Sequence, residues 1–195
     1  GMSTIRFERK GDMLNYVYLM PIKSDGTQSN VVPDWTTAIS KVELLIGGQV
    51  IDEQDSVYST LIAPTLSATS SSKSVAGDLY GGSTNERFYP LRFAFCENWQ
   101  TALPLISLQY HDVELRITWG AAADTYKWEV YANYAYLDTQ EREMFASKPQ
   151  NMLITQVQKA ISSGSKTQEL NFNHPIKYIA ASNVTAVNMC LDTNK

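Results

Sequence analysis

The sequence predicts an all-β sandwich, and three observations support this fold class. Residues 113–119 and 128–136 alternate apolar and polar side chains with a period of two, which is typical of half-buried strands. Short runs of this kind recur along the chain, with Gly, Pro, Asn and Ser between them. Helical and strand patterns do not alternate regularly, which argues against a parallel α/β sheet.

Strands are expected at residues 5–8, 13–20, 39–51, 87–95, 113–119, 128–136, 151–158, 170–179 and 185–191. Gly47-Gly48 predicts a turn or bulge inside the third of these runs. Pro90 weakens the fourth as a central strand, because proline has no N–H to donate to a neighbouring strand. Residues 21–34 and 67–82 are rich in Ser, Gly and other turn formers, so we expect surface loops there.

Helical structure is expected only in short segments between strands. Residues 55–66 are compatible with a short helix weakened by Pro64, and residues 96–101 with a helical turn. Asp138 and Glu141 form the pattern of a capping box, which predicts a helix to about residue 147. Residues 102–107 are too apolar for an exposed loop, so we expect them under one end of the sandwich or against a neighbouring subunit.

Composition restricts the classes of function. The chain has 195 residues, of which 44% are hydrophobic and 18% charged, so it has enough apolar residues for a core. Its formal net charge of −4 argues against nucleic-acid binding, which needs an excess of Lys and Arg. Cys96 and Cys190 belong to no C-x-x-C pair, and we expect both to be reduced.

The sequence contains no convincing catalytic, cofactor or metal site. His111 and His174 are the only histidines, and neither has a second His or Cys at metal-ligand spacing. His111 precedes Asp112 and lies near Glu114, so a metal site is an alternative to a structural role for this residue. Glu141 and Glu143 are expected on a solvated helix surface. Gly47-Gly48 and Gly81-Gly82 lack the Lys and Ser/Thr of a phosphate-binding loop.

Two alternative functions follow from the residues themselves. Sandwich loops can hold sugar-binding sites, and Tyr80, Tyr89 and Trp99 are candidates to stack on a sugar ring. A glycosidase or cupin-type enzyme is the other alternative, with a metal near His111.

Several runs together resemble a known family. They are residues 10–14 (KGDML), 42–52 (VELLIGGQVID), 87–95 (RFYPLRFAF), 102–113 (ALPLISLQYHDV), 136–142 (YLDTQER) and 170–178 (LNFNHPIKY). In this order they are similar to the major capsid proteins of nucleocytoplasmic large DNA viruses, such as phycodnaviruses and mimivirus relatives. Any one run is a weak signal, whereas their common order is specific, and the resemblance covers nearly the whole chain.

The resemblance implies a structural protein with a double jelly-roll fold. Three copies would form a capsomer of an icosahedral shell, in contact with other capsid proteins. It implies no catalytic residue, cofactor, metal, small-molecule substrate or direct contact with nucleic acid. The expected location is the capsid of a virion assembled in the host cytoplasm.

The resemblance also implies a domain organisation. Residues 1–159 correspond to the N-terminal jelly roll, 160–169 to a linker, and 170–195 to the start of a second jelly roll. Family members are much longer, so we expect a fragment in which the first strand of the first jelly roll is missing. An open sheet edge would result, and we hypothesise that residues 170–179 and 185–191 fill it within the chain or between two copies.

Overall fold

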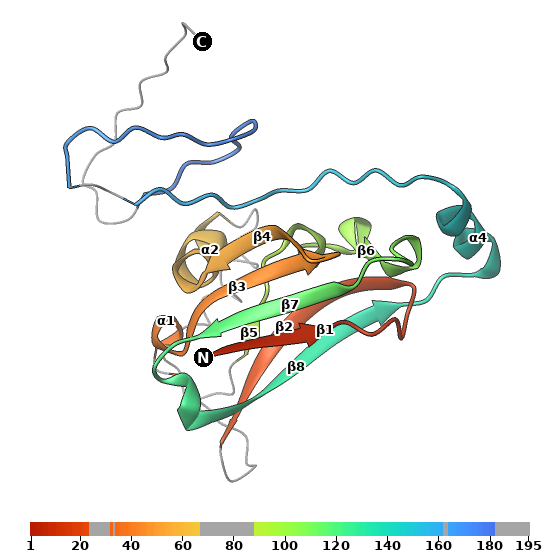
Figure 1. Ribbon diagram of the computed structural model, residues 1–195, viewed down its shortest axis with the longest axis horizontal. Helices are drawn as coiled ribbons and strands as arrows, with labels where there is room; N and C mark the ends of the chain where they lie inside the picture. Colours follow the sequence, from red (N-terminus) through yellow and green to blue (C-terminus); the bar gives the residue numbers. More distant parts are fainter. Residues whose placement is uncertain (24–31, 33, 67–87, 162–163, 182–195) are drawn as a thin grey trace, which may run out of the picture. The chain divides into compact units, whose positions relative to one another are not determined.

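The computed structural model describes residues 1–23, 32, 34–66, 88–161 and 164–181 (Figure 1). The chain forms two compact units, residues 1–157 and residues 158–195. Every helix and strand assigned in the described residues belongs to the first unit. The sequence places the end of the N-terminal jelly roll at residue 159, and its assignment of residues 170–195 to a second jelly roll stays a prediction.

One layer of the first unit is an antiparallel sheet of four strands in the order β1-β7-β3-β4. Its strands are β1 (Met2–Arg6), β7 (Val113–Trp119), β3 (Ile39–Ile46) and β4 (Gln49–Asp55). The predicted strand at 39–51 is thus a hairpin. Gly47 and Gly48 form its turn with φ of 59° and 80°, a conformation that favours glycine and suits a two-residue hairpin turn.

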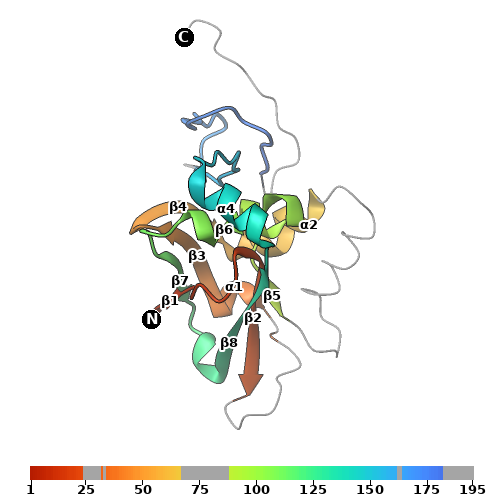
Figure 2. The ribbon, with the colours of Figure 1, turned by 90° about the vertical axis from the view of Figure 1, so that its right-hand side faces the viewer.

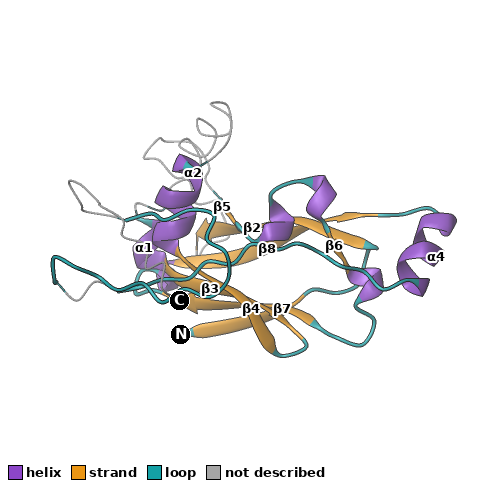
Figure 3. Cartoon of the chain, turned by 90° about the horizontal axis from the view of Figure 1, so that it is seen from above, coloured by secondary structure: helices purple, strands orange, loops and turns teal. Residues whose placement is uncertain are grey.

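The second layer is built around the long strand β2 (Met13–Lys23). Along one edge β2 pairs with β8 (Tyr126–Ala135), and along the other it pairs with the short strands β5 (Tyr89–Pro90) and β6 (Leu103–Pro104). Figure 2 and Figure 3 show the two sheets as separate layers that face each other. This arrangement confirms the predicted all-β sandwich.

The core lies between the two sheets, as the alternating patterns predicted. The inward side chains of β7 (Val113, Leu115 and Ile117) are at most 3% exposed. Opposite them, Leu14, Val17 and Leu19 of β2 are at most 1% exposed. Full burial of an aliphatic side chain contributes roughly 1.5–3 kcal/mol, so these two strands supply much of the stability of the unit.

The connecting segments contain short helices, which also agrees with the prediction. They are α1 (Trp35–Ala38), the π-helical turn Tyr58–Ile62, α2 (Ala63–Thr65), the 3-10 turns Ala94–Cys96, Trp99–Thr101, Leu105–Ser107 and Ala123–Thr125, and α4 (Thr139–Ser147). The predicted capping box begins α4: Glu141 N–H donates to Asp138, and Asp138 N–H donates to Glu141. The apolar segment 102–107 packs against β2. This agrees with the first of its two expected positions, which was under one end of the sandwich.

Two predictions in the middle of the chain are wrong in extent. The strand expected at 87–95 is reduced to Tyr89–Pro90, after which the chain leaves the sheet and enters a 3-10 turn. Pro90 has no N–H to extend the pairing, which is the physical reason for the short strand. The loop expected from residue 21 begins later, because β2 continues to Lys23. The rest of that loop, apart from residues 32 and 34, and the loop at 67–82 lie outside the described residues.

Two strands predicted near the C-terminus are also wrong. Residues 151–158 and 170–179 are described, and neither segment contains a strand. A short apolar run in the sequence does not show whether a partner strand lies beside it, which explains the first error. His174 adopts a φ of 71° directly before Pro175 and turns the chain, which explains the second. Within this chain residues 170–179 form no strand and so do not fill a sheet edge, whereas exchange between two copies stays a prediction; residues 185–191 lie outside the described part of the chain.

Among the described residues, helices are too short and too polar to cross a membrane.

Candidate functional site

A buried carboxylate joins the turn before β2 to the segment that follows β8. Asp12 is 5% exposed. Its Oδ2 accepts a hydrogen bond from Leu137 N at 2.8 Å, and its Oδ1 lies 3.0 Å from Nε of Arg142 in α4. Its backbone N–H also donates to the carbonyl of Ala135 at 3.1 Å. Two runs that carry the resemblance, 10–14 and 136–142, are therefore in direct contact.

A glycine allows this approach. A Cβ at Gly11 would lie 2.6 Å from Cβ of Tyr134 on β8, closer than two such carbons can be. The capping box places the other side of the contact, because it starts α4 at Thr139 and Arg142 N donates to the carbonyl of Asp138 at 3.0 Å. The sequence predicted the helix but not its contact with Asp12.

A second buried carboxylate, Asp52, lies on β4 at the edge of its sheet. Asp52 is 6% exposed, and its oxygens accept hydrogen bonds from Val157 N at 2.9 Å, Glu53 N at 3.0 Å and Gln54 Nε2 at 2.8 Å. Gln54 Nε2 also donates to the carbonyl of Arg92 at 2.9 Å. Runs 42–52 and 87–95 therefore meet through Gln54.

Burial raises the pKa of Asp52 to about 6, against an ordinary value of 3.8. The hydrogen bonds from Val157, Gln54 and Glu53 oppose this effect, and the charge of Glu53 adds to it. A perturbed pKa can mark a catalytic acid, but such a role also needs a cleft and a convergent partner. The donors around Asp52 are backbone and amide N–H groups, so the arrangement positions chain segments and offers no general acid–base pair.

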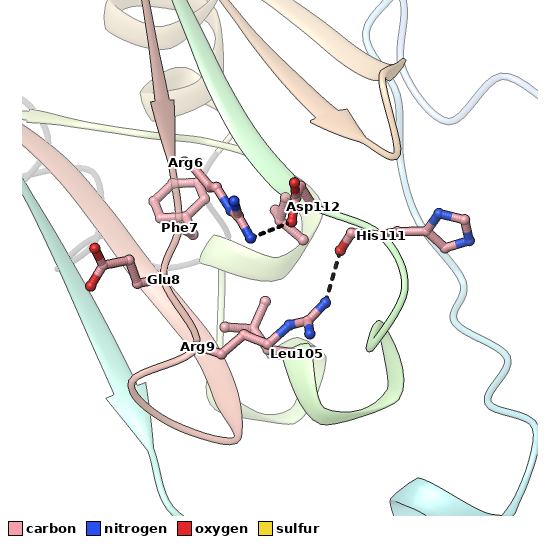
Figure 4. A pocket seen from close by; sticks show the side chains of 8 residues that line it. Arg6, Phe7, Glu8, Arg9, Leu105, His111 and Asp112 are labelled. Atoms are coloured by element: carbon pink, nitrogen blue, oxygen red, sulfur yellow. Dashed lines mark hydrogen bonds and ion pairs between the residues drawn. The ribbon is translucent and has the colours of Figure 1, made fainter.

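A shallow cavity of about 410 Å³ lies where β1 ends and β7 begins (Figure 4). It is lined by Arg6, Phe7, Glu8, Arg9, Leu105, His111, Asp112 and Val113. Arg6 pairs with Asp112 at 2.8 Å, and Arg9 donates to the carbonyls of Leu108 and His111. Both guanidinium groups are thus used to hold the end of the sandwich together.

The histidines have positions that fit structural roles. The imidazole of His111 points away from Arg6 and Arg9 (Figure 4) and packs against the β3–β4 turn, where a Cβ at Gly47 would lie 2.8 Å from its Nδ1. His174 occupies a turn in the second unit. The described residues contain no group of three His, Cys, Asp or Glu side chains that could hold a metal ion.

The aromatic residues considered for sugar binding have different environments. Tyr89 is fully buried and packs on Trp35 at 5.5 Å between ring centroids, so its expected role in stacking on a sugar is wrong. Trp99 is 51% exposed and packs edge-on against Tyr16 at 5.5 Å. Tyr80 lies outside the described residues.

The remaining candidates also fit structural roles. Cys96 is a free thiol, and burial raises its pKa to about 12, so it stays protonated and is no nucleophile at neutral pH. Cys190 and Gly81-Gly82 lie outside the described residues. Glu141 caps α4, and Glu143 lies exposed on the same helix.

One long sheet edge lacks a partner strand among the described residues. β8 pairs with β2 along one side only. Its inward side chains are half-buried rather than buried: Tyr126, Trp128, Val130, Ala132 and Tyr134. The sandwich is therefore less well covered along β8 than along β7.

The model of the family described as "Major capsid protein N-terminus" matches residues 1–190 of the chain. The chain belongs to this family. This capsid-family chain is 34% identical over 200 residues to the major capsid protein of Pyramimonas orientalis virus, an alignment that covers 89% of the chain and 50% of the relative. It is 32% identical over 209 residues to the major capsid protein of Paramecium bursaria Chlorella virus 1, covering 90% of the chain and 47% of the relative.

Solved structures show the same relationship. A chain of the quasi-atomic model of the PBCV-1 virus capsid superposes with a TM-score of 0.65 at 27% identity, covering 90% of this chain and 50% of that one. A PBCV-1 VP54 crystal structure, fitted into a reconstruction of the virophage Sputnik, gives 0.64 at 27% identity, covering 80% and 43%. The capsid-family chain has the jelly-roll fold and spans about half the length of the curated relatives that it matches.

Sequence reasoning missed the two buried carboxylates of this capsid-family chain. Asp12 and Asp52 both lie inside runs that carry the family resemblance, and those runs were the available signal. A carboxylate inside a mainly apolar strand or beside a tight turn indicates a buried acceptor with defined donors. Their donors, Arg142 and Val157, are more than 100 positions away in the sequence, so the fold alone brings them together.

Proposed function

We propose that this chain is the N-terminal half of a structural capsid protein, and that its jelly roll is a building unit of the shell of a large DNA virus. The observation that carries the proposal is the fold match to a PBCV-1 virus capsid chain over 90% of this chain at 27% identity. The family match over residues 1–190 supports it independently.

The finer parts of the proposal concern assembly. The whole protein forms trimeric capsomers, contacts other capsid proteins and is assembled into virions in the host cytoplasm. Half-buried apolar side chains along β8 and the exposed Trp99 support protein contacts at this layer of the sandwich. The net charge of −4 supports a role without direct contact to nucleic acid.

We further propose that the chain is not an enzyme. Three polar residues of the described cavity, Arg6, Arg9 and Asp112, bind one another or backbone carbonyls of the same unit. The two buried carboxylates likewise accept hydrogen bonds from the chain itself. Contacts of this kind within one unit stabilise a rigid building block.

Purified virus particles provide the test. We expect peptides of this chain to be among the most abundant in particles banded on a density gradient, and antibodies raised against residues 1–157 to label the surface of intact particles. Infected-cell lysate serves as the control fraction. Peptides present in the lysate but absent from purified particles would contradict a structural role in the shell.

A further inference from the structure

The segment that leaves the first unit runs extended past the edge of β4. This segment, residues 150–157, follows α4 and is called the strap here (Figure 1). Val157 is the last residue of the first unit, and the second unit begins at Gln158. Three apolar side chains of the strap keep part of their surface exposed: Met152 is 37%, Leu153 95% and Ile154 43% exposed. Apolar burial therefore holds the strap in place only in part.

Polar contacts hold one end of the strap. Val157 N donates to Oδ1 of Asp52 at 2.9 Å, and Gln156 Nε2 donates to the carbonyl of Ile51. Two consecutive strap residues thus bind two consecutive residues of β4. The Val157 bond ends on a side-chain carboxylate, and hydrogen bonds to charged groups are stronger than those between neutral groups.

The Asp52 side chain is held firmly enough to act as an anchor. Oδ1 also accepts from Glu53 N at 3.0 Å, and Oδ2 accepts from Gln54 Nε2 at 2.8 Å, an amide that is itself bound to the carbonyl of Arg92 at 2.9 Å. All three groups that face the carboxylate are N–H donors. An ionised carboxylate is an acceptor only and satisfies all of them.

We propose that the Asp52 carboxylate is a clasp that holds the strap on the edge of β4 and thereby fixes the point at which the chain leaves the sandwich. This role goes beyond shell building, because it concerns how one unit of the chain is tethered to the next. Asp52 acts as a positioning residue for the strap.

The charge state of Asp52 controls the clasp. The bond from Val157 lowers the pKa of Asp52, so by reciprocity protonation of Asp52 weakens that bond. Glu53 is the neighbouring charge that raises the pKa, while β3 faces Asp52 with Leu44. Gln54 links Asp52 to the carbonyl of Arg92, and the strap residues Gln156 and Val157 are uncharged. The clasp is therefore closed above a pH of about 6 and weakens below it.

Hydrogen exchange of the 195-residue chain at pH 7.5 tests the clasp. We expect the Val157 amide to be protected in the wild type and to lose at least tenfold of its protection in Asp52→Asn, whose neutral side chain keeps one acceptor oxygen but removes the charge that strengthens the bond. Glu53→Gln is the matched control: it also removes one negative charge from β4, but its side chain does not bind the strap, so Val157 stays protected. An unprotected Val157 amide in the wild type, or unchanged protection in Asp52→Asn, overturns the proposal.

A titration of the wild type tests the same idea if Asp52→Asn fails to fold. NMR shifts of the Asp52 carboxyl carbon and the Val157 amide are expected to move together, with a common midpoint near pH 6. A Val157 shift that does not respond while Asp52 titrates overturns the proposal. Neither outcome bears on whether the protein is found in virions, so the clasp and the proposed function succeed or fail separately.

Discussion

Arg142 and Asp12 are 130 positions apart in the sequence, yet Nε of the arginine lies 3.0 Å from Oδ1 of the aspartate. The aspartate side chain is 6% exposed and the arginine side chain 57% exposed, so the pair is buried at one end and solvated at the other. Removing the buried member of such a pair leaves N–H donors without their acceptor, whereas removing the exposed member leaves a carboxylate that still binds Leu137 N.

We therefore predict that Asp12→Ala lowers the free energy of unfolding by about 2–3 kcal/mol, and Arg142→Ala by only about 1 kcal/mol. Urea unfolding followed by circular dichroism measures both. Arg6→Ala is the control, because the Arg6–Asp112 pair has a similar distance of 2.8 Å but is exposed at both ends. Its effect is expected below about 0.5 kcal/mol. Equal effects for Asp12→Ala and Arg6→Ala would show that the buried contact contributes no more to stability than the exposed one.

A second prediction concerns the core between the sheets. Leu115 of β7 is 0% exposed, so Leu115→Ala removes buried methyl groups and leaves a cavity. We expect a loss of about 2–5 kcal/mol in the free energy of unfolding. Leu153→Ala makes the same chemical change at a side chain that is 95% exposed, and its effect is expected within about 0.5 kcal/mol. Comparable losses in the two variants would mean that β7 does not form the core described above.

The sequence predicted the parts of the fold that depend on local pattern. Period-two alternation located β7 and β8 closely, and the Asp138–Glu141 capping box located α4. The strand expected at residues 151–158 is instead an extended strap without a partner strand, because a short apolar run does not show whether a sheet edge lies beside it. Periodicity describes the conformation of a segment itself. Strand pairing depends instead on which sheet edge the fold brings close to that segment.

The candidate site was less predictable for the same reason. Asp12 and Asp52 are unremarkable as single carboxylates in a sequence, since most such residues are solvated. Their burial follows from the contact of each with a segment more than 100 positions away. Tyr89 shows the opposite error: this aromatic residue of the expected strand 87–95 was a candidate for stacking on a sugar ring, but it is fully buried against Trp35.

The raised pKa of Asp52 predicts a specific dependence of stability on pH. Between the unfolded value of 3.8 and the folded value of about 6, the folded state holds a proton that the unfolded state has lost. The folded state then binds more protons, so the free energy of unfolding increases as the pH falls through this window. The contribution of Asp52 is up to about 3 kcal/mol, because one unit of pKa corresponds to about 1.36 kcal/mol.

Unfolding of wild type and Asp52→Asn at pH 4 to 8 measures this contribution. The variant cannot titrate at position 52, so the difference between the two proteins isolates Asp52 from all other carboxylates. We expect the wild type to gain stability relative to the variant as the pH falls from 7 to 4. A constant difference across this range would show that Asp52 titrates alike in the folded and unfolded states.

The turn between β3 and β4 gives a final prediction, which separates backbone strain from close packing. Gly47 and Gly48 both have positive φ, but a Cβ at Gly47 would lie 2.8 Å from Nδ1 of His111, whereas a Cβ at Gly48 would meet nothing within 4 Å. Gly48→Ala should therefore lower the free energy of unfolding by about 1 kcal/mol through strain alone. Gly47→Ala adds a clash, and we expect a loss of about 2 kcal/mol or more.

His111→Ala tests the origin of the larger effect. In the double variant with Gly47→Ala the clash is gone, so the loss caused by Gly47→Ala should fall to the value of Gly48→Ala, because only strain remains. Thermal unfolding of the four variants completes a double-mutant cycle with a coupling of about 1 kcal/mol. If the effects of Gly47→Ala and His111→Ala are additive, the imidazole does not pack on this turn, and the structural role of His111 would have to be abandoned.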